Sequence, residues 1–112
     1  QCSEESRAKA FLEVQVKAAN LQCPKKLDYM TTLDKCEVTG NRTLSYVLSV
    51  DGNWDGENSE NVKKQLRLNL IKNLKSMTDI QRFREYKINI EYLYNDTKGN
   101  KLFQINITPD EY

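Results

Sequence analysis

The segment Ile88–Pro109, INIEYLYNDTKGNKLFQINITP, contains two stretches of alternating apolar and polar residues around a short polar turn. Successive side chains of a β-strand point to opposite faces of a sheet, so this period of two predicts two half-buried strands. Gly99-Asn100 supplies the turn between them, and Pro109 ends the second strand. The segment therefore predicts a β-hairpin with one apolar face, on which Tyr92, Tyr94 and Phe103 are expected to be core residues rather than a platform for a ligand.

The same alternation occurs earlier in the chain, where residues 33–39 and 44–50 predict a second hairpin around Gly40-Asn41. A helix is expected before each hairpin, over residues 4–21 and from Ser59 onward, because apolar residues recur there at helical spacing. The stripe of the second helix contains Val62, Leu66, Leu70, Leu74 and Met77. We predict an α+β fold of two layers with the order helix-hairpin-helix-hairpin (αββαββ), in which two helices pack on one face of a four-stranded antiparallel sheet.

The length of 112 residues predicts one domain that spans residues 1–112. When the two Gly-Asn turns are superposed, Leu44 aligns with Phe103 and Asp51 aligns with Asp110. An internal repeat of residues 3–51 and 59–110 is one interpretation of this match. The other is that two alternating patterns agree by chance.

The composition excludes several classes of function. The formal net charge of +1 argues against a nucleic-acid partner. The chain contains no histidine and therefore lacks the usual general base and the commonest metal ligand, so we do not expect an enzyme, and we expect no cofactor apart from the calcium considered below. No apolar run is long enough for a membrane span, so contact with a membrane would need a lipid anchor or surface attraction.

The three cysteines do not have the spacing of a zinc or redox motif. Cys23 and Cys36 flank an irregular segment, and one hypothesis is a disulfide between them, which requires an oxidising compartment and hence export. The alternative is two buried thiols. Cys2 lies where a lipid-modified bacterial cysteine would lie, although Gln1 is a poor match to the residue expected before it.

The second helix and its continuation are locally basic, with eight Lys or Arg between residues 62 and 87 against two acidic residues. Lys64, Arg67 and Lys75 share one flank of this helix and are candidates for binding an anionic partner. A solvated face is the alternative interpretation. Trp54, in a predicted loop, is either a lid folded back on the domain or an exposed interface anchor.

The loop Asp51-Gly52-Asn53-Trp54-Asp55-Gly56 matches the first half of a calcium-binding loop. Asp51, Asn53 and Asp55 are the candidate ligands. Val62 stands at the twelfth position, where a bidentate glutamate would complete the site. The alternative is a strand-to-helix connection that uses these residues for their turn chemistry.

Two groups of bacterial proteins resemble this chain, the first in its predicted helix-hairpin order and the second in the stretches Cys23–Asp28, Thr31–Leu33, Leu44–Tyr46 and Ile105–Asp110. One is the β-lactamase-inhibitor-protein-like domains of bacterial envelopes, and the other is small uncharacterised exported proteins. The resemblance implies a non-catalytic exported module, periplasmic, envelope-anchored or secreted, that binds or inhibits an unknown protein partner. A structural or calcium-dependent envelope component is the alternative function.

Overall fold

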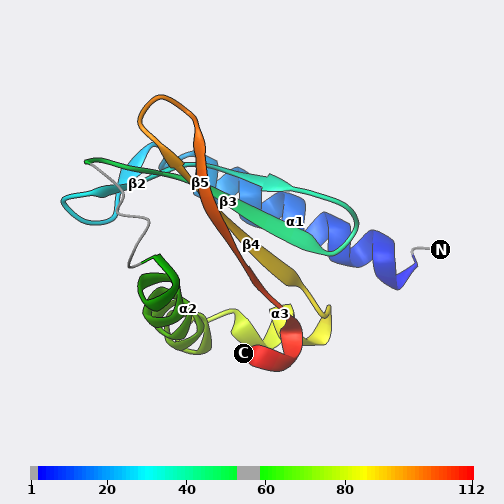
Figure 1. The fold of residues 1–112 in the computed structure, drawn as a ribbon. Helices are drawn as coiled ribbons and strands as arrows, with labels where there is room; N and C mark the ends of the chain where they lie inside the picture. Colours follow the sequence, from blue (N-terminus) through cyan, green and yellow to red (C-terminus); the bar gives the residue numbers. More distant parts are fainter. Residues whose placement is uncertain (1–2, 53–58) are drawn as a thin grey trace.

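The structure is a computed structural model that describes residues 3–52 and 59–112. Its elements follow one another in the order α1 (Glu4–Asn20), β1 (Lys25–Lys26), β2 (Thr31–Val38), β3 (Thr43–Val50), α2 (Ser59–Lys75), α3 (Ile80–Glu85), β4 (Asn89–Asp96), β5 (Lys101–Ile107) and the 3₁₀ helix η2 (Pro109–Glu111). Both predicted hairpins are present, as β2–β3 and β4–β5 (Figure 1). None of the helices in the described ranges is long and apolar enough to cross a membrane.

The sheet is mixed and has five strands in the order β1-β2-β3-β4-β5, so the predicted four-stranded antiparallel sheet is wrong. The central strands β3 and β4 are parallel and pair from Thr43↔Asn89 to Val50↔Asp96. The connection between them explains this direction. Helix α2 has 17 residues and is about 25 Å long, close to the length of an eight-residue strand. It carries the chain back along the sheet, so β4 starts at the same end as β3 (Figure 1).

Most apolar side chains of the strands lie on one face of the sheet, the core face, and the helices pack on it. Neighbouring strands place matching residues side by side there, for example Leu44 beside Ile90 and Ile90 beside Ile107. The opposite face carries mainly polar side chains, together with Val47 beside Leu93. On it the Ser45 hydroxyl donates a hydrogen bond of 2.6 Å to the Glu91 carboxylate. The helices therefore cover one face of a sheet whose strand number and strand directions differ from the prediction.

Two helix side chains hold α1 against β2 and α2 against β5. Asn20, at the end of α1, accepts a hydrogen bond from the Cys36 N–H at 2.7 Å and donates one to the Cys36 carbonyl oxygen at 3.0 Å. Arg67 of α2 donates to the Asn106 carbonyl oxygen of β5 at 2.8 Å. Cys36 belongs to β2 and Asn106 to β5. The two helices therefore lie on the same face but are fixed to strands on opposite sides of the central β3–β4 pair.

One end of the core face, the closed end, is covered by α3 and η2. Its residues are almost completely buried and comprise Phe83, Ile88, Ile90, Ile107 and Tyr112. The Tyr112 hydroxyl lies 3.1 Å from the Phe83 carbonyl oxygen and 2.7 Å from the Ile88 carbonyl oxygen, to which it donates. The Phe11 ring of α1 packs edge-on against Phe83, with 5.2 Å between centroids. The closed end is therefore a packed core in which the buried hydroxyl is satisfied.

Candidate functional site

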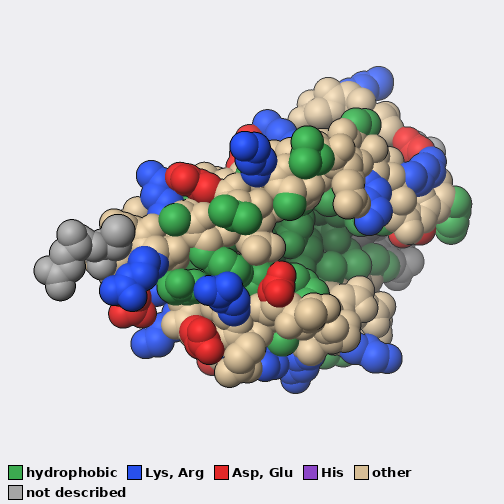
Figure 2. All heavy atoms as spheres, turned by 180° about the vertical axis from the view of Figure 1, so that it is seen from behind, with side chains coloured by type: hydrophobic (Ala, Val, Ile, Leu, Met, Phe, Trp, Pro, Cys, Tyr) green, Lys and Arg blue, Asp and Glu red, His purple; other side chains and the backbone are tan. Residues whose placement is uncertain are grey.

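The other end of the core face is not closed, and a cavity of about 740 Å³ lies there between α2 and the sheet. We call it the α2 groove; Figure 2 shows it as a hollow lined with hydrophobic side chains. Its apolar lining comes from α2, from the segment after β1 and from four strands: Leu27, Tyr29, Met30, Leu33, Tyr46, Leu48, Val50, Val62, Leu66, Leu70, Tyr92, Tyr94 and Phe103. A mainly apolar cleft of this volume is typical of a binding site.

The groove exists because α2 packs closely against the sheet at its C-terminal end and less closely toward its N-terminal end. Leu74 is 2% exposed, whereas Val62, three turns earlier on the same stripe, is 43% exposed. Leu66 and Leu70 lie between these extremes and line the groove. The predicted amphipathic helix is present, but Val62, Leu66 and Leu70 of its apolar stripe line the groove, and of the stripe only Leu74 is fully buried.

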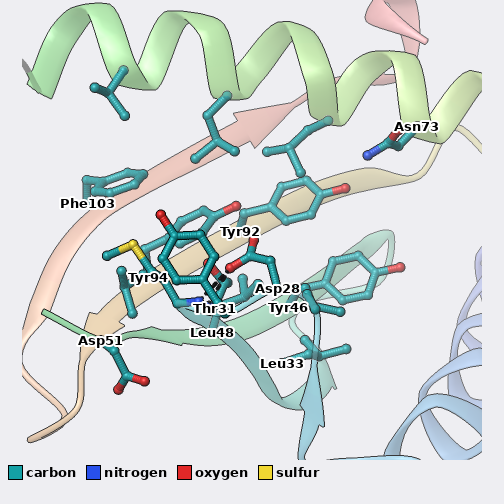
Figure 3. A pocket seen from close by; sticks show the side chains of 17 residues that line it. Asp28, Thr31, Leu33, Tyr46, Leu48, Asp51, Asn73, Tyr92, Tyr94 and Phe103 are labelled. Atoms are coloured by element: carbon teal, nitrogen blue, oxygen red, sulfur yellow. Dashed lines mark hydrogen bonds between the residues drawn. The ribbon is translucent and has the colours of Figure 1, made fainter.

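Two aromatic pairs form the floor of the groove (Figure 3). The rings of Tyr46 and Tyr92, which are neighbours on the parallel strands, stack with 5.2 Å between their centroids. The rings of Tyr94 and Phe103, which are neighbours on β4 and β5, stack at 4.6 Å. Tyr92, Tyr94 and Phe103 are less than a tenth exposed, as predicted for inward-facing strand positions. Stacking of this kind makes a flat, rigid apolar surface.

The hydroxyl groups of Tyr46, Tyr92 and Tyr94 have no hydrogen-bond partner among residues 3–52 and 59–112. Among the same residues, no fully buried side-chain N or O atom lacks a partner, so these three oxygens are reached from the groove. Burial raises the pKa of all three groups, that of Tyr94 to about 12. The hydroxyls are therefore neutral and available as both donors and acceptors.

Two carboxylates lie at the mouth of the groove. Asp28 accepts hydrogen bonds of 2.8 Å from the backbone N–H groups of Met30 and Thr31, and the Met30 bond contributes most to lowering its pKa. The Asp51 carboxylate is 3.9 Å from Lys26, and both side chains are more than half exposed. The Asp51 N–H donates to the Met30 carbonyl oxygen at 2.8 Å. These contacts fix the segment that carries Tyr29 and Met30 over the groove.

The predicted basic flank of α2 is only partly free. Arg67 forms a salt bridge with Glu111 in addition to its bond to the Asn106 carbonyl oxygen, so it serves the fold. Lys64 and Lys75 are exposed. The binding of an anionic partner by these two lysines stays a prediction.

The structure does not contain the predicted disulfide, because Cys23 and Cys36 are free thiols. The Cys23 thiol donates to the Ala19 carbonyl oxygen at 3.3 Å, in the last turn of α1. Cys36 is buried on the core face, and burial raises its pKa to about 11, with a smaller contribution from Cys23. This agrees with the alternative of a buried thiol for Cys36. Cys2, the candidate for lipidation, lies outside the described residues.

Most of the predicted calcium loop cannot be placed. Asn53 and Asp55 lie outside the described residues, and so does Trp54. Among residues 3–52 and 59–112, no cluster of three or more acidic, His or Cys side chains is placed to hold a metal ion. Calcium binding by Asp51, Asn53 and Asp55 stays a prediction.

The groove tyrosines were not predicted as site residues from the sequence. Strand alternation assigned Tyr92 and Tyr94 to the core, and this alternation is correct. The available signal was chemical. A buried tyrosine needs a partner for its hydroxyl, and three tyrosines at inward positions of two neighbouring strands require three such partners.

Three solved structures share this fold. Each match covers at least 96% of this chain and at least 94% of the other chain. A Pseudomonas aeruginosa protein that is assumed to be secreted has 15% sequence identity and a TM-score of 0.80. The pilotin EpsS of the Vibrio vulnificus type 2 secretion system has 5% identity and a TM-score of 0.75. The type II secretion system pilotin AspS of Vibrio cholerae has 12% identity and a TM-score of 0.72.

These identities show the shared fold alone, and the β-lactamase-inhibitor-like resemblance is not among the similarities found. No curated protein matches the sequence. One family model matches residues 6–103, which include the α2 groove and nearly all of the sheet. The chain therefore belongs to the DUF8479 family, a domain of unknown function.

Proposed function

We propose that this protein is a non-catalytic, exported binding module that holds an apolar segment of a protein partner in the α2 groove. The observation that carries the proposal is the groove itself: a cavity of about 740 Å³ between α2 and a stacked aromatic floor. Two of the three similar structures are pilotins of type II secretion systems and the third is assumed to be secreted, which supports a role in export or at the cell envelope.

The surface around the groove favours a polypeptide over a small molecule. Three apolar side chains at its mouth are strongly exposed, namely Leu27 at 50%, Tyr29 at 84% and Val62 at 43%. A small ligand inside the cavity would leave them in water. A polypeptide segment would fill the groove and also cover its mouth, which buries a continuous apolar surface with a central aromatic cluster.

The exposed lysines of α2 support a second candidate function less well. An anionic partner bound along this helix would meet Lys64 and Lys75, but Arg67, the third member of the predicted flank, is already engaged by Glu111 and β5. In addition, Lys63 lies 2.8 Å from Glu60, which compensates part of the charge. The basic flank therefore contributes less to the proposal than the groove.

Helix α2 offers a matched pair of substitutions that tests the proposal. Val62 and Leu68 are both exposed apolar residues of this helix, but only Val62 lines the groove. The probe is a fluorescent synthetic peptide of about 16 residues with leucine at helical stripe positions. A scrambled peptide of the same composition is its control, and binding is measured by fluorescence anisotropy.

Val62→Asp places a charge in the groove and should weaken binding of the striped peptide at least tenfold, because the carboxylate loses water when the groove is filled. Leu68→Asp adds the same charge to the same helix and should leave the affinity within about twofold of the native value. Equal effects of the two substitutions, or equal binding of the striped and scrambled peptides, would refute the α2 groove as the binding site.

A further inference from the structure

Of the three groove hydroxyls without a partner among the described residues, those of Tyr92 and Tyr94 belong to almost fully buried side chains, whereas Tyr46 is only half-buried. Tyr92 is 7% exposed and Tyr94 is 4% exposed, and neither hydroxyl has a hydrogen-bond partner among the described residues. In Figure 3 both side chains rise from β4 toward α2 into the groove. Two of the most buried side chains of a mainly apolar site thus present polar groups.

The aromatic character of the floor does not require these hydroxyls. Phe103 occupies the neighbouring position on β5, stacks on Tyr94 at 4.6 Å and lines the same groove without a hydroxyl. Phenylalanine therefore fits this floor. For a wholly aliphatic occupant, phenylalanine would also be the better residue at positions 92 and 94, because tyrosine would lose contact with water and gain no partner in return.

From this contrast we infer that the segment bound in the α2 groove carries a polar, uncharged hydrogen-bonding side chain among its apolar residues, which meets the hydroxyls of Tyr92 and Tyr94. The inference rests on the proposed function, because it describes the occupant of the same groove. The chemistry required is an amide or a hydroxyl, such as Gln, Asn, Ser or Thr, since these groups both donate and accept. A charged side chain at this depth would lose its water and find only neutral partners.

The two hydroxyls then discriminate among partners, because they disfavour segments that cannot form hydrogen bonds with them. An apolar segment without a polar group would fill the groove and cover both oxygens, which leaves them unpaired. A segment with one correctly placed amide would satisfy them and would exclude water to the same extent. Sites that hydrogen-bond a ligand discriminate strongly against analogues that lack the bonding group, because the groups of the site are then left without partners.

The test combines the striped leucine peptide with a set of variants in which glutamine replaces each stripe leucine in turn. These peptides are titrated against the native protein, Tyr92→Phe, Tyr94→Phe and the double variant. Tyr86→Phe is the matched control, because Tyr86 packs on Phe11 outside the groove. Thermal melts of every variant establish that it is folded.

We expect the native protein to bind one of the glutamine peptides more tightly than the other glutamine peptides. For that peptide each groove substitution should weaken binding about threefold to tenfold, whereas binding of the all-leucine peptide should be unchanged or tighter. Tyr86→Phe should leave the affinity for both peptides unchanged. If the double variant keeps the native ratio of glutamine to leucine affinities at every position, the inference is wrong while the groove remains the site. If the native protein binds none of the peptides, the proposed function fails as well.

Discussion

Tyr112 and Tyr94 are two buried tyrosines at opposite ends of the core face. They are 5% and 4% exposed, and burial raises the pKa of each to about 12. The Tyr112 hydroxyl donates to backbone carbonyl groups within the closed end, whereas the Tyr94 hydroxyl faces the α2 groove and has no partner among the described residues. Equal burial therefore has different meanings: one tyrosine completes the fold, and the other is available to a ligand.

The difference arises from what covers each end of the sheet. At the closed end, α3 and η2 place Phe83 and Tyr112 against the strands. At the open end, among the described residues, the first half of α2 is the helix that lies above the floor, and it stays exposed at Val62. One sheet thus combines a completed core with an incomplete one, and the incomplete end is the binding site that we propose. The following predictions test this division.

The largest expected effect is the contrast between Phe83→Ala and Leu70→Ala. Phe83 is 1% exposed in the closed end, so its truncation should lower the free energy of unfolding by about 3–5 kcal/mol. Leu70 is only half-buried beside the groove, so its truncation should cost about 1 kcal/mol, because the side chain already faces solvent on one side. Urea denaturation of both variants measures the difference. Equal losses would mean that α2 is packed as tightly as α3 and that the groove is closed in solution.

A smaller effect is expected from removing one oxygen atom at each end. Tyr112→Phe removes the bond to the Ile88 carbonyl oxygen in a buried site and should cost about 1–2 kcal/mol. Tyr94→Phe removes a hydroxyl without a partner and should change stability by less than about 0.5 kcal/mol in either direction. Thermal melts compare the two variants at one pH. A loss for Tyr94→Phe as large as that for Tyr112→Phe would show that its hydroxyl serves the fold.

The smallest effect is a pH dependence of the closed end. The Thr108 N–H bonds the Glu111 carboxylate, and this bond, with a lesser contribution from Arg67, holds the pKa of Glu111 below its ordinary value of 4.5. A carboxyl group with a lowered pKa stabilises the fold above its ordinary pKa, and this contribution is lost as the pH falls through the lower, folded-state value. We expect a loss of less than about 1 kcal/mol below pH 4.5, since the group is near the surface.

Urea denaturation between pH 6 and pH 3, an interval of about three pH units around that ordinary value, measures this loss. Glu111→Gln is the control, because it should reduce the pH dependence and leave peptide binding in the α2 groove unchanged. An identical pH profile for the native protein and Glu111→Gln would show that the η2 contact does not stabilise the closed end.

The sequence predicts much of the fold because its local signals are strong. The alternation in residues 88–107 identifies the β4–β5 hairpin and its inward-facing residues correctly. The direction of β4 relative to β3 is not encoded in that alternation, since a parallel and an antiparallel neighbour bury the same side chains. It depends on the path of α2, whose direction follows from packing and not from the periodicity of either strand.

The site was harder to predict for a related reason. The stripe Val62, Leu66, Leu70 and Leu74 shows that one side of α2 is apolar, but it does not say whether the covering surface belongs to the same chain. In the structure the stripe is divided: Leu74 is buried by the same chain, whereas Val62 remains exposed. Arg67 shows the opposite case: its place in a basic cluster suggested a partner, but its contacts are internal.

The hydrogen bonds that join Asn20 to Cys36 and Arg67 to Asn106 have a consequence for solubility. Backbone groups at the margin of a sheet are templates on which another molecule can add a strand, and uncontrolled addition leads to aggregates. In this protein β1 pairs only with Thr32 and Leu33 of β2, and the side chain of Asn20 binds the backbone of Cys36 farther along that strand. The side chain of Arg67 binds one backbone group of the edge strand β5. We expect these two contacts to hinder the addition of a further strand at Cys36 and at Asn106, so that the proposed apolar groove can stay open without the same exposure of backbone groups at these points.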